Sequence, residues 1–108
     1  MAYDENLVQR IRRVLAKERV VERKMFGGLT FMVSGHMCCG VADERMMVRV
    51  GPDAYERSIR RVAVKPFDVT GKPMKGMVWV EPEALRTAPQ LKNWLNKGLT
   101  YVRSLPPK

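Results

Sequence analysis

The chain has 108 residues, enough for one domain with a modest hydrophobic core. Its 20 Lys and Arg residues outnumber 11 Asp and Glu residues, and the formal net charge of +9 attracts nucleic acids or acidic protein surfaces. No apolar run approaches the roughly 20 residues of a membrane-spanning helix, and the start lacks signal-peptide features. Two cysteines are too few for a disulfide scaffold. We therefore expect a single cytoplasmic domain, residues 1–108, outside membranes.

A helix is predicted over residues 4–18. Leu7, Val8 and Ile11 begin an apolar face at a period of 3.6 residues. Asp4 is placed to cap the free amide groups at the helix start. The opposite face is basic and carries Arg10, Arg12, Arg13 and Lys17.

Three strands are predicted next, at residues 29–33, 37–42 and 46–50. Ser34-Gly35 is a turn signal, and residues 43–45 form the second tight connection. Short links of this kind join antiparallel neighbours, so the three strands form a meander.

The second half of the chain is expected to begin with a helix that opens at Gly51-Pro52-Asp53 and stops at Pro66. Tyr55, Ile59 and Val62 supply its inward stripe. Two strands, a helical turn and a last helix follow in the prediction, at residues 67–69, 77–81, 82–85 and 89–104, with Thr87 as the last helix cap. The order α-β-β-β-α-β-β-α indicates an α+β fold, in which helices cover one face of an antiparallel sheet of about five strands.

His36, Cys38 and Cys39 are the residues that most resemble a reactive site. We expect His36 at the exposed mouth of a hairpin, where it lacks the nucleophile and orienting partner that a general base needs. Neighbouring strand residues point to opposite faces, so one cysteine should lie in the core and the other should be partly covered. With one histidine and two cysteines in the chain, the set of about four ligands for a structural zinc is missing. We predict no catalytic residue and no metal ligand, and a redox role of either cysteine stays open.

The glycine-rich segments do not match nucleotide-binding motifs. Gly27-Gly28 precedes a strand, whereas a dinucleotide fingerprint has three glycines before a helix. The segment TGKPMKG, residues 70–76, lacks the spacing of a phosphate-binding loop. We expect no cofactor, and we assign turns or close backbone approaches to Gly27, Gly28, Gly35, Gly71 and Gly76. Gap filling in the core is the expected role of the eight methionines, and a minority exposed in a patch could serve adaptable partner binding.

Four segments together resemble the TfoX/Sxy N-terminal domain family: MFGGLTFMVSGHMCCGV, MMVRVGPDAYE, PFDVTGKPMKGMVWV and the closing RSLPPK. Three triplets in this order carry the resemblance: residues 26–28, 49–51 and 74–76. The match covers about Tyr3 to Lys108. It implies an α-β-β-β-α-β-β-α fold similar to that of type III secretion chaperones.

The same resemblance implies a role. The family's namesakes are similar to coactivators of competence genes that act with the cyclic-AMP receptor protein, and they also carry a C-terminal TfoX domain. The chain is expected to be a stand-alone N-terminal domain without that second domain. What the resemblance implies for it is a small, non-enzymatic regulatory or interaction module.

Two functional hypotheses follow from the sequence. The first is a protein–protein interaction module in transcriptional regulation, able to form a homodimer and to contact a transcription factor or RNA polymerase. Its candidate surface is basic: Arg10, Arg12, Arg13, Arg49, Lys72 and Lys75. The second is weak, sequence-independent binding of nucleic acid, which the charge favours and the scarcity of aromatic residues disfavours. An enzyme acting through Cys38 or Cys39 is a third, remote hypothesis because partner groups are missing.

Overall fold

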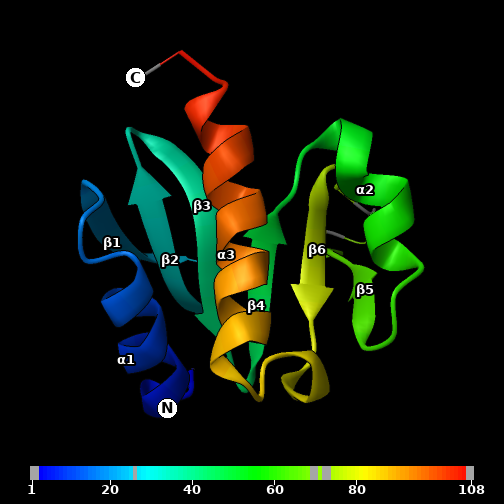
Figure 1. Cartoon of the computed structure of the whole chain (residues 1–108), viewed down its shortest axis with the longest axis horizontal. Helices are drawn as coiled ribbons and strands as arrows, with labels where there is room; N and C mark the ends of the chain where they lie inside the picture. The colour runs from blue at the N-terminus through cyan, green and yellow to red at the C-terminus, as the bar shows by residue number, and fades with distance from the viewer. Residues whose placement is uncertain (1–2, 26, 69–70, 72–73, 107–108) are drawn as a thin grey trace.

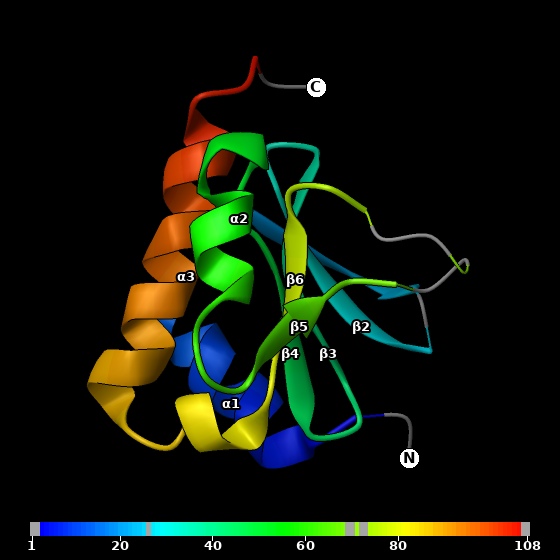
Figure 2. The same ribbon diagram turned by 90° about the vertical axis from the view of Figure 1, so that its right-hand side faces the viewer.

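The computed structural model describes residues 3–25, 27–68, 71 and 74–106. Within these ranges, three α-helices lie on one face of a six-stranded antiparallel sheet with the strand order β1-β2-β3-β4-β6-β5 (Figures 1 and 2). The elements are α1 Glu5–Val14, β1 Val20–Met25, β2 Gly28–Val33, β3 His36–Ala42, β4 Arg45–Arg49, α2 Pro52–Ile59, β5 Val64–Pro66, β6 Met77–Val80, the 3-10 helix η1 Pro82–Ala84, and α3 Ala88–Arg103. The predicted α+β class and element order are confirmed, with one more strand than expected. None of the described helices is long and apolar enough to cross a bilayer.

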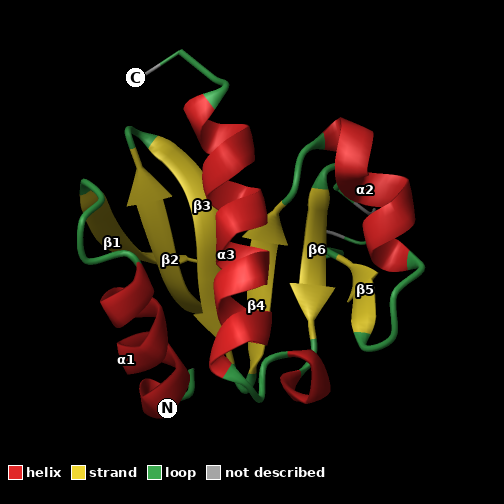
Figure 3. Ribbon diagram, in the orientation of Figure 1, coloured by secondary structure: helices red, strands yellow, loops and turns green. Residues whose placement is uncertain are grey.

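The additional strand is β1, the edge strand beside β2 in Figure 3. It was missed because its middle residues are all charged, Glu22, Arg23 and Lys24, and they hide the alternation of a strand. The predicted helix of residues 4–18 correspondingly ends earlier, at Val14. Its start is as predicted, since a carboxylate oxygen of Asp4 accepts hydrogen bonds from the amides of Asn6 and Leu7, at 2.8 and 3.1 Å.

The connection between α2 and β6 also differs from the prediction. α2 ends at Ile59 rather than continuing toward Pro66, and Val62 is 89% exposed instead of facing inward. Ala63 has a φ of 65°, so the chain reverses direction here and enters β5 at Val64. The strand predicted at residues 67–69 is therefore displaced by three residues toward the N-terminus, and Val69 lies outside the described residues.

The main core lies between the helices and the sheet. α3 crosses β3 and β4 at its centre (Figure 1) and buries Leu91, Trp94, Leu95 and Leu99. Gly98 allows this close packing, because a Cβ atom there would lie 3.0 Å from the carbonyl oxygen of Cys38. The predicted cap of α3 is present as a capping box, in which Thr87 and Gln90 each bond the other's backbone amide.

Candidate functional site

The basic residues of α1 are largely engaged within the molecule. Arg10 donates a hydrogen bond of 2.7 Å to the carbonyl oxygen of Leu85. This bond connects α1 to the segment between η1 and α3. Arg12 donates two hydrogen bonds to Glu22 of β1, at 2.8 and 2.7 Å. These bonds lower the pKa of Glu22 below its ordinary value and raise the pKa of Arg12. Arg13 is exposed. The arginines of α1 thus include two that stabilise the fold.

The other basic residues predicted for the interaction surface lie elsewhere. The guanidinium carbon of Arg49 is 5.4 Å from the ring centroid of Tyr101, at the end of β4 near α2. Lys75 is exposed beside Gly76, whose carbonyl oxygen accepts a hydrogen bond of 3.0 Å from the amide of Gly51. Lys72 lies outside the described residues. The structure therefore places the described candidates in two regions, α1 and the β4–α2 junction, rather than on one continuous surface.

The five glycines assigned to structural positions all lie at special backbone sites. Four have positive φ: Gly27, Gly35, Gly71 and Gly76. Gly28 lies against the backbone of β3, and a Cβ atom there would be 1.9 Å from the carbonyl oxygen of Val41. These residues shape the strand connections.

His36 is not the exposed turn residue that the sequence suggested. It is 8% exposed and begins β3. Its Nε2 atom lies 2.6 Å from the carbonyl oxygen of Pro106, which can only accept a hydrogen bond, so Nε2 carries the proton. The contact joins residues 70 positions apart, beyond the reach of local sequence reasoning. His36 thus anchors the segment after α3.

Cys38 and Cys39 do not point to opposite faces, and neither is partly covered. The pairing of β2 with β3 shifts register between Phe31 and Met32, which leaves Cys38 as the extra residue of a bulge. Both cysteines are 0% exposed, belong to the main core and are free thiols. The hydrogen bond with Cys38 and then burial raise the pKa of Cys39 well above its ordinary value. This environment suppresses the thiolate that redox or nucleophilic chemistry needs, and no three ligand-type residues in the described chain form a metal site.

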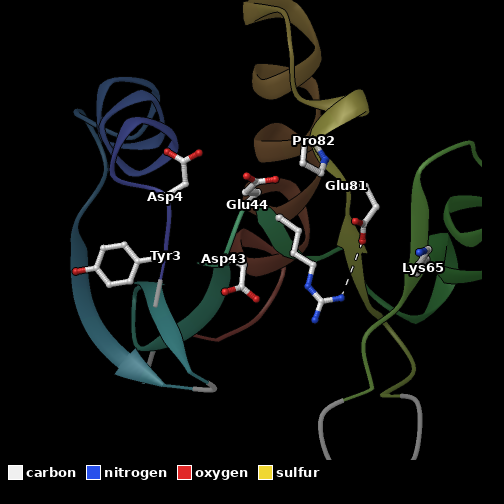
Figure 4. A pocket seen from close by; sticks show the side chains of 8 residues that line it. Tyr3, Asp4, Asp43, Glu44, Lys65, Glu81 and Pro82 are labelled. Atoms are coloured by element: carbon white, nitrogen blue, oxygen red, sulfur yellow. Dashed lines mark ion pairs between the residues drawn. The ribbon is translucent and has the colours of Figure 1, made fainter. Parts of the chain in front are cut away.

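A groove of about 640 Å³ opens at the end of the sheet near the start of α1 (Figure 4). The guanidinium carbon of Arg45 lies 4.0 Å from the ring centroid of Trp79, and its Nη1 atom lies 4.0 Å from Oε2 of Glu81. That carboxylate oxygen is buried without a hydrogen bond, so Arg45 is its charge partner. The lining has four acidic side chains and two basic ones: Asp4, Asp43, Glu44 and Glu81, with Arg45 and Lys65. The groove thus has a mixed-charge lining without a histidine or cysteine.

A second groove, of about 490 Å³, lies between α2 and α3. α3 contributes a polar row on its outward side: Asn93, Asn96, Lys97 and Thr100. Asp53 and Arg57 of α2 line the other wall. The groove therefore carries two cations, Arg57 and Lys97, and one carboxylate, Asp53, beside several amide and hydroxyl groups, which are common donors to phosphate oxygens.

The face of the sheet opposite the helices, here called the open face, carries a second hydrophobic cluster. Its buried members are Ala42, Met47, Phe67, Met77 and Trp79. All three α-helices that the structure describes lie on the other side of the sheet (Figure 2). Two partly buried methionines pack against this cluster: Met74, from the segment that leads into β6, and Met37 of β3.

Over β1, β2 and β3 the open face is less well covered. Alternation places five residues there that we call the methionine patch: Val21, Arg23, Met25, Met32 and Met37. Val21 is 58% exposed, Arg23 is exposed, and the three methionines are partly exposed. The expectation of gap-filling methionines fits Met46, Met47 and Met77, which are buried. The residues of this patch were not identified from the sequence, because alternation shows which residues share a face but not which face the helices cover.

These features define a small α+β domain whose sheet has one helix-covered face and one open face. The family model for the TfoX N-terminal domain matches residues 13–101, and the chain belongs to this family, which is associated with the regulation of competence. No curated protein and no solved structure matches the chain.

Proposed function

We propose that this protein is a non-enzymatic interaction module that regulates transcription in the cytoplasm through protein–protein contacts. Its partner is a transcription factor or RNA polymerase, and family membership supports this direction. The observation that carries the proposal is the methionine patch. A set of partly exposed apolar side chains on a sheet face without helices is typical of a binding surface. Methionine side chains are flexible and adapt to the shape of a partner.

Affinity purification from native extract of the source cells tests the proposal. The tagged chain is cross-linked in the extract, and the captured proteins are quantified against the tag alone. We expect RNA polymerase subunits or a sequence-specific transcription factor to be enriched at least tenfold. Recovery of neither, from an extract in which both are detected, would count against a role in transcription.

Weak binding of nucleic acid is a second candidate function, favoured by the groove between α2 and α3. Lys97 and Arg57 face this groove together with amide and hydroxyl groups, which are common donors to the phosphate backbone. Such contacts would give sequence-independent binding, with a dissociation constant on the order of 10⁻⁴–10⁻⁶ M that weakens as salt rises.

Fluorescence anisotropy with a random 20-base-pair DNA at two salt concentrations measures this activity. Between 50 and 200 mM salt we expect affinity to fall at least about tenfold, as the release of several counterions requires. The double variant Arg57→Gln, Lys97→Gln should reduce the slope of log affinity against log salt concentration by about two, because each substitution removes one phosphate contact. The matched control, Arg13→Gln on α1 with Lys17→Gln in the turn that follows α1, should leave this slope unchanged. Binding that is absent or insensitive to salt would eliminate this function.

A further inference from the structure

We propose that the methionine patch is the docking site for an acidic amphipathic helix of a partner protein, with one carboxylate of that helix paired to Arg23. This inference rests on the proposed function and names the surface and the chemistry of the partner. It is carried by the register of the strands, the exposure of the patch residues and their charge.

The patch is continuous across three strands. Val21 is the direct cross-strand partner of Met32, and Met32 is the partner of Met37, so these side chains form one apolar row. Met25 lies two rows away, opposite Gly28. Arg23 lies in the row between, opposite Thr30, which is in turn opposite Gly40.

Arg23 is the exposed side chain of its row. Its cross-strand neighbour Thr30 is 2% exposed and lines a small hollow with Met25 and Phe67, so larger side chains cover Thr30 and leave Arg23 accessible at the β1 end of the row. A bound segment that packs apolar side chains on Met32 and Met25 would bring a residue between them close to Arg23. The geometry selects an apolar face with a polar group at its centre.

Charge decides the nature of that group. Arg23 is exposed and has no ion pair among the described residues, and no acidic residue of β1, β2 or β3 shares the open face. Glu22, the one acidic residue in these strands, lies on the helix side, where Arg12 binds it. A carboxylate at the centre of the partner's apolar face would give Arg23 a charge-assisted hydrogen bond. The net charge of +9 also favours an acidic partner.

The dimensions of the patch suit one helix. The outer strands of three neighbours are about 10 Å apart, close to the diameter of an α-helix with its side chains. β1 and β2 have six residues each, which corresponds to about 20 Å of strand or a helix of about 13 residues. The opposite face already shows this arrangement, with α3 packed on β3 and β4.

Other occupants fit the patch less well. A second copy of the chain, placed face to face about a two-fold axis, would bring two Arg23 side chains together in an apolar interface with no acid to balance them. Nucleic acid needs exposed aromatic rings or several cations, but on this face Trp79 is 5% exposed and Phe67 is 0% exposed. The patch itself contains a single cation, so an acidic protein segment is favoured.

Methyl NMR of the full chain, labelled at its methionine methyl groups, tests the docking site directly. The probe is a synthetic 16-residue amphipathic helix with leucines on one face, one glutamate at the centre of that face, and glutamates on the other face. We expect the methyl signals of Met25, Met32 and Met37 to shift on titration. Met46, which is 0% exposed in the main core, should stay unchanged and serves as the internal control.

Charge reversal makes the test specific for Arg23. Replacing the central glutamate of the peptide by lysine should weaken binding to the natural chain at least about tenfold, and Arg23→Glu should restore binding of the lysine peptide. Val21→Glu should also weaken the binding of the glutamate peptide about tenfold. Val62→Glu changes a valine that is 89% exposed outside the patch and should alter affinity less than twofold. Circular dichroism verifies that each variant is folded.

The outcomes separate this inference from the proposed function. Three results would overturn the docking site. The methyl signals of the patch could stay unchanged when the peptide is added, shift when the chain alone is concentrated, or respond to a 20-base-pair DNA instead of the peptide. If the natural chain captures a transcription protein and Val21→Glu captures it equally well, the patch is refuted while the proposed function stands. If no such protein is captured but the peptide binds with charge reversal, the patch stands and the proposed function fails.

Discussion

Replacing Gly28 with alanine should lower the free energy of unfolding by about 3 kcal/mol or more. This is at the upper end of what it costs to force extra atoms into a filled site. The new Cβ atom would lie 1.9 Å from the carbonyl oxygen of Val41 and 2.8 Å from its carbonyl carbon. Both are backbone atoms of β3, so the clash cannot be relieved by a rotamer change. β2 must move away from β3, and the hydrogen bonds between these central strands are then strained or lost.

Urea denaturation followed by circular dichroism measures the free energy of unfolding of this variant. The adjacent Gly27→Ala is the matched control. Gly27 has a φ of 74°, but no neighbouring atom lies within 4 Å of the position that an alanine Cβ would take, so the substitution should cost only the strain of the left-handed conformation, about 1–2 kcal/mol. Equal destabilisation by the two variants would contradict the close approach of β2 and β3 at Gly28.

The thiols of Cys38 and Cys39 should react with a disulfide reagent at pH 8 about 1,000-fold more slowly in the native chain than in the urea-unfolded chain. Both are 0% exposed beneath α3, so reaction requires local or global opening. An opening free energy of about 4–5 kcal/mol corresponds to a protection of this size. The raised pKa of Cys39 lowers its thiolate fraction further, and reaction should become faster as the pH increases.

Absorbance of the released thiolate measures both rates. Val21→Cys in a chain that keeps both natural cysteines adds a thiol at a position that is 58% exposed, and one equivalent should then react at close to the unfolded rate. If a natural thiol reacted within tenfold of its unfolded rate, the cysteine pair would be accessible and an activity based on it would have to be considered again.

Much of the local structure follows from short stretches of sequence. α1 and α3 have periodic apolar faces and side-chain caps at Asp4 and Thr87, so both could be predicted. The strands β2, β3 and β4 combine β-branched residues with turn signals at their ends. These features depend on neighbours in the chain, which is why sequence patterns reveal them.

The candidate site depends on contacts that the chain makes at long range. β1 is a strand because β2 offers it a partner, despite the charges of Glu22 to Lys24. The alternation in β2 could be predicted from the sequence. The methionine patch exists only because β1 pairs with β2, a bulge shifts the register of β3, and all the described helices pack on the other side of the sheet.

The sequence by itself determined the α+β class, the caps, most strands and the basic character of this protein. Tertiary structure alone decided that the cysteines share the core, that His36 binds the carbonyl of Pro106, and that the basic residues of α1 lie apart from Arg49 and Lys75. The physical reason is that periodicity and capping are local, whereas a bulge, the burial of a side chain and the covering of a sheet face depend on which distant segments pack together.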